Sequence, residues 1–82
     1  MAAKAFILIE TTMGKTKEVV TILERAEGVV SVDAVTGPYD VIAVVEVPDV
    51  NTLGDLVKKH MHSVDGIART VTCITARLGD PS

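Results

Sequence analysis

The chain has 82 residues, a net charge of −3 and 48% hydrophobic residues, but only 2% aromatic residues. This length suits one compact unit, so residues 1–82 are predicted to form a single domain with an aliphatic core. The eight Lys and Arg residues are scattered without interleaved aromatic side chains, which argues against direct binding to nucleic acid.

Two further classes of protein are excluded by what the chain lacks. Its one cysteine, Cys73, permits neither an internal disulfide nor a multi-cysteine metal site. No apolar run approaches the roughly 18 residues of a membrane span, and the first residues do not resemble a signal peptide. We therefore expect a cytoplasmic protein.

The first half of the chain predicts a strand, a helix and a second strand. Residues 4–10 form a short apolar run typical of a strand, and residues 15–27 change to a helical period that Gly28 ends. Residues 29–36 alternate as a strand does. The side chains expected to face inward from the helix are Val19, Ile22, Leu23 and Ala26.

The second half predicts the same three elements again. Residues 39–47 form a long apolar strand, Pro48 stops it, and Asp49 is a good N-cap for a helix that ends at Gly66. Residues 67–78 are predicted to be the last strand. The helix is expected to turn five side chains inward: Val50, Leu53, Val57, Met61 and Val64.

A short motif that occurs twice in the sequence indicates the topology. Each helix ends in an acidic residue, a glycine and a β-branched residue, Glu27-Gly28-Val29 and Asp65-Gly66-Ile67. The order βαββαβ built from two such units predicts an α+β, ferredoxin-like fold. Right-handed crossovers place both helices on one face of a four-stranded antiparallel sheet, with the first and third strands central.

The two central strands are apolar at nearly every position, as residues 5–9 and 41–45 show. Continuous apolar runs are typical of strands buried on both faces, yet two helices cover only one face. The uncovered face measures on the order of 400 Å² from strand spacing and rise, and a monomer rarely exposes such a patch. We therefore predict a sheet-to-sheet homodimer of the dimeric α/β-barrel type.

No catalytic, metal or cofactor site is evident. Gly14-Lys15-Thr16 resembles the end of a P-loop, but Ile9 stands where the loop needs its first glycine. His60 and His62 point to different sides of a helix, so they cannot hold one metal together. Cys73 lies in mid-strand, where we expect a small packed residue.

One turn stands out. In residues 36–40 an aromatic and an acidic residue, Tyr39 and Asp40, follow Gly37-Pro38 at the mouth of a buried strand. Asp and Tyr are also common at strand ends, so the turn alone leaves a structural and a binding role open. Thr70 and Thr72 share one face of the last strand.

Together these features resemble the effector domain of the Lrp/AsnC family of transcriptional regulators, also called the RAM domain. The resemblance covers residues 5–78 and is carried by Gly28-Val29, Gly37-Pro38-Tyr39-Asp40, Gly66-Ile67 and Thr70-Val71-Thr72. It implies sheet-to-sheet dimers, ring-like higher oligomers and amino-acid effectors bound between dimers. The DNA-binding helix-turn-helix of full regulators is absent, which implies a stand-alone form.

The resemblance also implies which residues bind the ligand: Gly37, Pro38, Tyr39, Asp40, Thr70 and Thr72. An amino acid needs an acceptor for its ammonium group, which Asp40 offers, and donors for its carboxylate, which the threonines offer. The implied function is an amino-acid sensing and oligomerisation module. It is not an enzyme, has no cofactor, and acts through itself or through full-length Lrp/AsnC regulators.

Two alternatives remain at this point. A small dimeric α/β-barrel enzyme, an isomerase or a cofactor-free monooxygenase, would need polar residues in a cavity, for example a buried pocket holding His60 beside a carboxylate. A regulatory module of the ACT type would place a ligand-binding glycine in the first strand–helix loop, where Gly14 lies.

Overall fold

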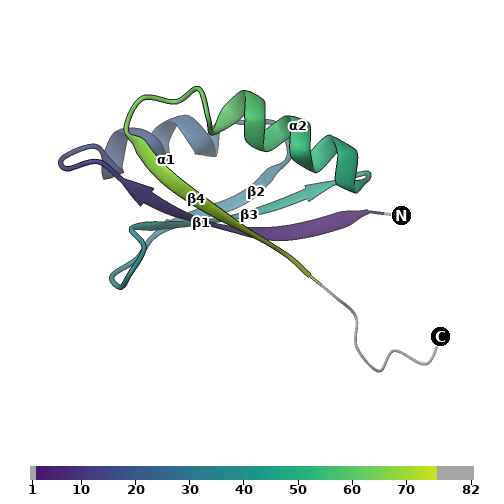
Figure 1. Cartoon of the computed structure of the whole chain (residues 1–82), viewed down its shortest axis with the longest axis horizontal. Coiled ribbons are helices and arrows are strands. Elements are labelled where there is room, and N and C mark those ends of the chain that lie inside the picture. The colour runs from purple at the N-terminus through teal and green to yellow at the C-terminus, as the bar shows by residue number, and fades with distance from the viewer. Residues whose placement is uncertain (1, 76–82) are drawn as a thin grey trace.

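The computed structural model describes residues 2–75, which form a βαββαβ unit with both helices on one face of the sheet (Figure 1). The elements are β1 (Ala3–Thr11), α1 (Thr16–Glu24), β2 (Val29–Ala34), β3 (Val41–Val47), α2 (Val50–His60) and β4 (Ile67–Ile74). The predicted α+β, ferredoxin-like fold is confirmed, and the sheet-to-sheet dimer stays a prediction. The end of the predicted last strand, residues 76–78, lies outside the described residues. Neither helix in this part of the chain is long and apolar enough to cross a membrane.

The sheet has the order β2-β3-β1-β4, and all three pairs are antiparallel. The prediction that the first and third strands are central is therefore confirmed. In the middle of the sheet Ile7 lies opposite Ala43 on one side and opposite Thr72 on the other. Residues paired in this way project to the same face, so the register assigns every strand residue to the helix side or to the open side.

The helix side of the sheet forms the core. Ile7, Ile9, Val41 and Val45 are fully buried there, because α1 places Val19 and Leu23 over them and α2 contributes Leu53 and Leu56. Met61, the residue after α2, is also fully buried. Each large aliphatic side chain buried in this way contributes about 1.5–3 kcal/mol, and this layer is the main source of the domain's stability.

The predicted inward faces of the helices are partly wrong. Ile22 is 47% exposed and Val50 is 57% exposed, whereas Leu56, absent from the prediction, is buried. Helix α1 also ends at Glu24 rather than Glu27, because Arg25 and Ala26 donate to carbonyls three residues earlier and tighten the last turn. Ile22 lies beside the covered stripe of α1, which Val19 and Leu23 form, rather than within it.

The open face, the side of the sheet without helices, carries a central apolar patch. Its residues come from three strands and pair across them: Phe6, Leu8, Ile42, Val44, Val71 and Cys73. Phe6 is 39% and Val71 37% exposed, and the three aliphatic side chains on β1 and β3 are half-buried. Cys73 is exposed in this single copy, so the expectation of a packed cysteine is wrong for it.

Candidate functional site

The predicted ligand-binding turn connects β2 to β3 and is closed by backbone hydrogen bonds. The Val35 amide donates to the Asp40 carbonyl oxygen at 2.9 Å, and the Asp40 amide donates to the Ile9 carbonyl oxygen at 2.9 Å. Gly37 and Pro38 are exposed at the tip, while Tyr39 and Asp40 are half-buried. The turn is therefore attached to β1 through Asp40 rather than through its tip.

The Asp40 carboxylate makes a structural contact that the sequence did not reveal. Its Oδ2 accepts hydrogen bonds from the Thr11 amide at 2.9 Å and from Thr11 Oγ1 at 3.1 Å. Thr11 Oγ1 lies in turn 2.8 Å from Oγ1 of Thr16, the first residue of α1. Asp40 thus ties the β2–β3 turn to the end of β1 and the start of α1.

These bonds help to fix the short loop between β1 and α1, residues 12–15, which we call the Met13 loop. Its backbone is held at both sides: the Thr12 amide donates to the Gly66 carbonyl at 2.8 Å, and the Lys15 amide donates to the Thr12 carbonyl at 3.1 Å. Gly14 adopts a φ of 81° in this tight turn, a conformation that glycine tolerates best. The backbone of the loop is thus hydrogen-bonded on both sides of a fully exposed Met13.

The two predicted threonines lie on the other side of β1 from this turn. Thr70 is opposite Ile9 and Thr72 is opposite Ile7, whereas β3, which follows the turn, pairs with the other edge of β1. Two strand spacings amount to about 10 Å. Within one copy, the structure therefore does not bring the turn residues and the threonines into direct contact.

Thr70 instead lines a shallow hollow of about 310 Å³ at the start of β4, together with Arg69 and His62. Arg69 is exposed, but it pairs with Glu10 whereas Thr70 pairs with Ile9, so the two side chains project to opposite faces of β4.

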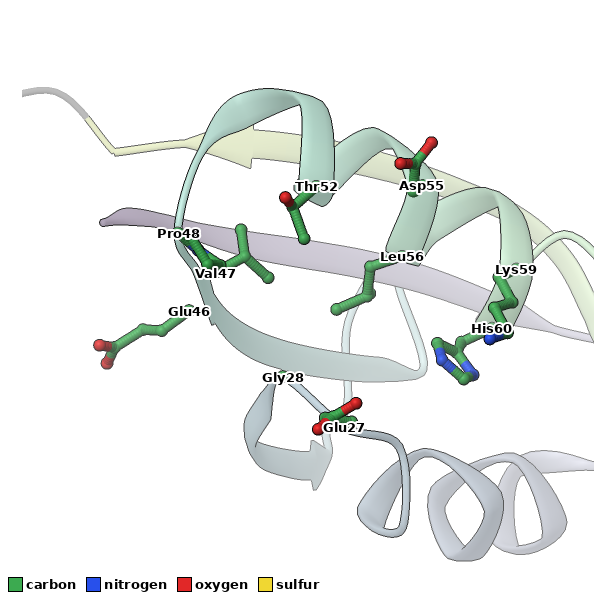
Figure 2. Close-up of a pocket in the computed structure, with 10 residues that line it drawn as sticks. All are labelled: Glu27, Gly28, Glu46, Val47, Pro48, Thr52, Asp55, Leu56, Lys59 and His60. Carbon is green, nitrogen blue, oxygen red and sulfur yellow. The ribbon is translucent and has the colours of Figure 1, made fainter. Parts of the chain in front are cut away.

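A second hollow, which we call the α2 groove, lies between α2, the end of β3 and the α1–β2 turn (Figure 2). It encloses about 440 Å³ and has ten lining residues: Glu27, Gly28, Glu46, Val47, Pro48, Thr52, Asp55, Leu56, Lys59 and His60. None of them belongs to the predicted ligand-binding set. Figure 2 shows Leu56 pointing from α2 toward Gly28, with Glu46 and Asp55 directed outward on either side.

The α2 groove does not supply the pocket that the enzyme alternative needed. His60 is half-buried there, and the three carboxylates of the groove are exposed at its rim rather than enclosed with the imidazole. Over residues 2–75, no group of three His, Cys, Asp or Glu side chains is placed to hold a metal ion.

Comparisons with known proteins identify relatives of this chain. Residues 4–77 match the family described as the Lrp/AsnC ligand binding domain. The chain is 33% identical to the protein TTHA0845 of Thermus thermophilus, with a TM-score of 0.88 over 93% of this chain and 95% of that one. It is 30% identical to the hypothetical protein PHS023 of Pyrococcus horikoshii, with a TM-score of 0.86 over 96% and 94%.

A longer regulator shares the fold. The transcriptional regulator NMB0573 of Neisseria meningitidis, solved as a complex with L-Met, is 19% identical, with a TM-score of 0.83 over 95% of this chain and 52% of that chain. The present chain thus spans about half the length of that regulator. A comparison with curated proteins gave no match.

Proposed function

We propose that this chain, which belongs to the family of Lrp/AsnC ligand binding domains, is a cytoplasmic regulatory module that binds an amino acid and associates with itself. In this proposal the chain is one domain, catalyses no reaction, needs no cofactor and does not itself contact DNA. It acts through its own assembly state or through full-length regulators of the same family. The observation that carries the self-association is the open face.

The open face has the features of a symmetric interface. Its apolar centre is flanked by opposite charges paired across neighbouring strands, Lys4 with Glu46 and Glu10 with Arg69. Lys4 Nζ also lies 5.6 Å from the centre of the Phe6 ring. An apolar centre with a charged rim resembles known interfaces, and a two-fold axis lets one such patch serve both copies.

The proposed ligand site combines the two groups of polar residues that flank β1. In it, Asp40 accepts hydrogen bonds from the ligand's ammonium group, with Gly37, Pro38 and Tyr39 beside it. Thr70 and Thr72 donate to the carboxylate. Because the two groups lie about 10 Å apart in one copy, we propose that a neighbouring copy completes the site. The L-Met complex of the Neisseria regulator supports an amino acid as the class of ligand.

The self-association is tested with Val44→Lys, which places a charge at the centre of the open face. We expect light scattering to give at least a dimer for the wild type and the mass of one subunit for the variant. Circular dichroism should remain unchanged, because Val44 faces away from the core. A wild type with the mass of a single subunit at micromolar concentration contradicts the proposal.

Ligand binding is tested by isothermal titration with each of the twenty amino acids. We expect at least one to bind the wild type, and we expect Asp40→Asn and Thr70→Val each to weaken it by about tenfold or more, since a charged hydrogen bond contributes about 1.5–3 kcal/mol. Thr21→Val, on the exposed side of α1, is the control and should bind normally. Absence of binding by all twenty contradicts amino-acid sensing but leaves the self-association standing.

A further inference from the structure

The two oxygens of the Asp40 carboxylate are in different situations. Each oxygen of an ionised carboxylate offers about two lone pairs to hydrogen-bond donors. Both lone pairs of Oδ2 are in use, because the Thr11 amide lies 2.9 Å from it and Thr11 Oγ1 lies 3.1 Å from it. Oδ2 is therefore saturated by the domain itself.

The other oxygen, Oδ1, is open. Within the described residues the hydrogen bonds of the Asp40 carboxylate are the two at Oδ2. Asp40 is half-buried, yet no enclosed side-chain oxygen in this part of the chain is left without a hydrogen-bond partner. Oδ1 is therefore reached by solvent, and its lone pairs are available to a molecule that binds from outside.

Asp40 is held at both its backbone and its side chain. Its amide donates to the Ile9 carbonyl oxygen at 2.9 Å, and Thr11, on the same strand as Ile9, holds Oδ2. An unrestrained carboxylate rotates broadly about its last torsion, and ordering it costs free energy when a ligand binds. Here the plane of the carboxylate is fixed before any ligand arrives, so Oδ1 has a set direction.

The hydroxyl of Thr11 is oriented by a second hydroxyl. Thr11 Oγ1 lies 2.8 Å from Thr16 Oγ1. Each hydroxyl carries one proton, and an ionised carboxylate only accepts. The Thr11 proton therefore points to Asp40 Oδ2, and the Thr16 proton points to Thr11 Oγ1. Donation thus runs from the first residue of α1, through the last residue of β1, to the carboxylate.

We infer that Thr11 is a positioning residue of the ligand site: it holds Oδ2 of Asp40 so that Oδ1 accepts the ammonium group of the bound amino acid. Thr16 supports Thr11, and neither threonine touches the ligand. The inference rests on the proposed function, because it deepens the role given there to Asp40. Neither Thr11 nor Thr16 belongs to the ligand-binding set predicted from the sequence.

A bond between a carboxylate and a neighbouring strand can also serve the fold alone. In that case the loss of the Thr11 hydroxyl would weaken all ligands of the site alike, or none of them. If Thr11 instead directs Oδ1 toward an ammonium group, only the part of the affinity that depends on this group should fall. The two roles are therefore separated by comparing ligands with and without the ammonium group.

The decisive variant is Thr11→Val, which keeps the shape of the side chain and removes its hydroxyl. The two probes are the amino acid that binds the wild type most tightly and the carboxylic acid that has hydrogen in place of its ammonium group. We expect Thr11→Val to weaken binding of the amino acid by about threefold to tenfold, the range for one hydrogen bond. Binding of the carboxylic acid should be unchanged. Isothermal titration measures the first, and competition with the amino acid measures the second.

Two variants are the controls. Thr11→Ser keeps both donors to Oδ2 and should restore most of the affinity for the amino acid. Thr12→Val removes an exposed hydroxyl from the next residue along the chain and should bind both probes as the wild type does. Circular dichroism of all variants checks that the fold is retained.

Thr16→Val tests the outer hydroxyl, and it carries the test if Thr11→Val does not fold. It leaves both bonds to Oδ2 in place but removes the donor that orients the Thr11 hydroxyl. We expect a smaller loss, about twofold, because neighbouring hydrogen bonds strengthen each other only modestly. The loss should again be confined to the amino acid. A Thr16→Val protein that binds the amino acid as the wild type does contradicts the ordered pair of hydroxyls.

The outcomes separate this inference from the proposed function. A Thr11→Val protein that binds the amino acid normally, or that loses affinity for both probes equally, overturns the inference and leaves amino-acid binding in place. A wild type that binds none of the twenty amino acids overturns both. The self-association through the open face is independent of either result.

Discussion

The two βαβ halves of the molecule end their helices in the same way but pack differently. Gly28 follows α1 with a φ of 92°, and Gly66 follows α2 with a φ of 103°. Each glycine touches the other half: a Cβ on Gly28 would lie 2.7 Å from Leu56 Cδ1, and one on Gly66 would lie 2.9 Å from Lys15 Cβ. Each half therefore packs its helix-ending glycine closely against a side chain of the other half.

The two glycines differ in the kind of atom that lies closest to their Cβ positions. Leu56 Cδ1 is the end of a flexible side chain at the border of the α2 groove, whereas Lys15 Cβ is fixed to the backbone, and Val19 Cγ2 also lies only 3.2 Å from the Cβ position on Gly66. The first contact can relax and the second cannot. A repeated sequence motif therefore does not imply an equal energetic role in both halves.

The largest effect is expected for Gly66→Ala. The alanine would be strained at positive φ and would press against Lys15 and Val19, so we expect a loss of about 2–4 kcal/mol in the free energy of unfolding. Urea unfolding at one fixed protein concentration measures it. Gly14→Ala is the matched control, because Gly14 also has a positive φ but no atom lies within 4 Å of its Cβ position. Equal losses in the two variants would show that packing at Gly66 contributes nothing.

Gly28→Ala should cost less than Gly66→Ala, about 1–2 kcal/mol, because Leu56 can rotate away and leave mainly the backbone strain. The double variant Gly28→Ala/Leu56→Ala tests the contact directly, because Leu56→Ala removes the Cδ1 atom that the new methyl group would meet. Urea unfolding of both single variants and the double variant should give a coupling energy that differs from zero. Strict additivity contradicts the contact.

The helix starts also differ between the halves. Thr52 donates its amide at 2.7 Å and its hydroxyl at 2.9 Å to Asp49 Oδ1 at the start of α2, whereas no side chain caps the start of α1. The Thr52 amide, followed by the Thr52 hydroxyl, lowers the pKa of Asp49 below its usual value. We expect Asp49→Ala to lower the Tm by a few degrees at neutral pH.

The pH dependence of that change follows from the direction of the shift. A carboxylate whose pKa is lowered on folding stabilises the protein above its unfolded pKa of about 3.9, and this contribution is lost as the pH falls through the lower folded value. The difference in Tm between Asp49→Ala and wild type should therefore shrink in acid. Asp55→Ala, an exposed carboxylate on the same helix, is the control and should show a smaller difference in Tm at neutral pH.

The smallest effect, and the only gain, is expected for Gly54→Ala in the middle of α2. No atom lies within 4 Å of its Cβ position, so alanine should raise the free energy of unfolding by about 0.5–1 kcal/mol through its higher helix propensity. Thermal unfolding measures it. A loss would show that α2 needs its glycine for a contact made outside a single copy.

The sequence predicted the sheet better than the helices. Runs such as residues 5–9 and 41–45 identify the central strands, because they lack the polar alternation of a strand with one face in water. Helix faces are harder, since the covered stripe depends on where the helix lies over the sheet. Leu56 is buried and Val50 is exposed for that reason, and helical period alone could not distinguish them.

The candidate site was predictable as residue types but not as geometry. Asp40 stood out in the sequence, yet its bonds to Thr11 join residues 29 positions apart in the sequence, and only the paired sheet brings them together. The separation of Asp40 from Thr70 likewise follows from strand order. Asp40 directly precedes β3, Thr70 lies in β4, and β1 lies between these two strands. The α2 groove is formed by three segments that are separate in the sequence, so no local sequence pattern predicts it.

The bond between Asp40 and Thr11 has a thermodynamic consequence. An ammonium group that recruits Asp40 Oδ2 competes with the Thr11 amide and hydroxyl, the same donors that anchor the loop carrying Met13. A ligand bound at Asp40 through that oxygen would therefore loosen the attachment of the β2–β3 turn to the β1–α1 loop, and the free energy lost at that attachment would lower the ligand's apparent affinity.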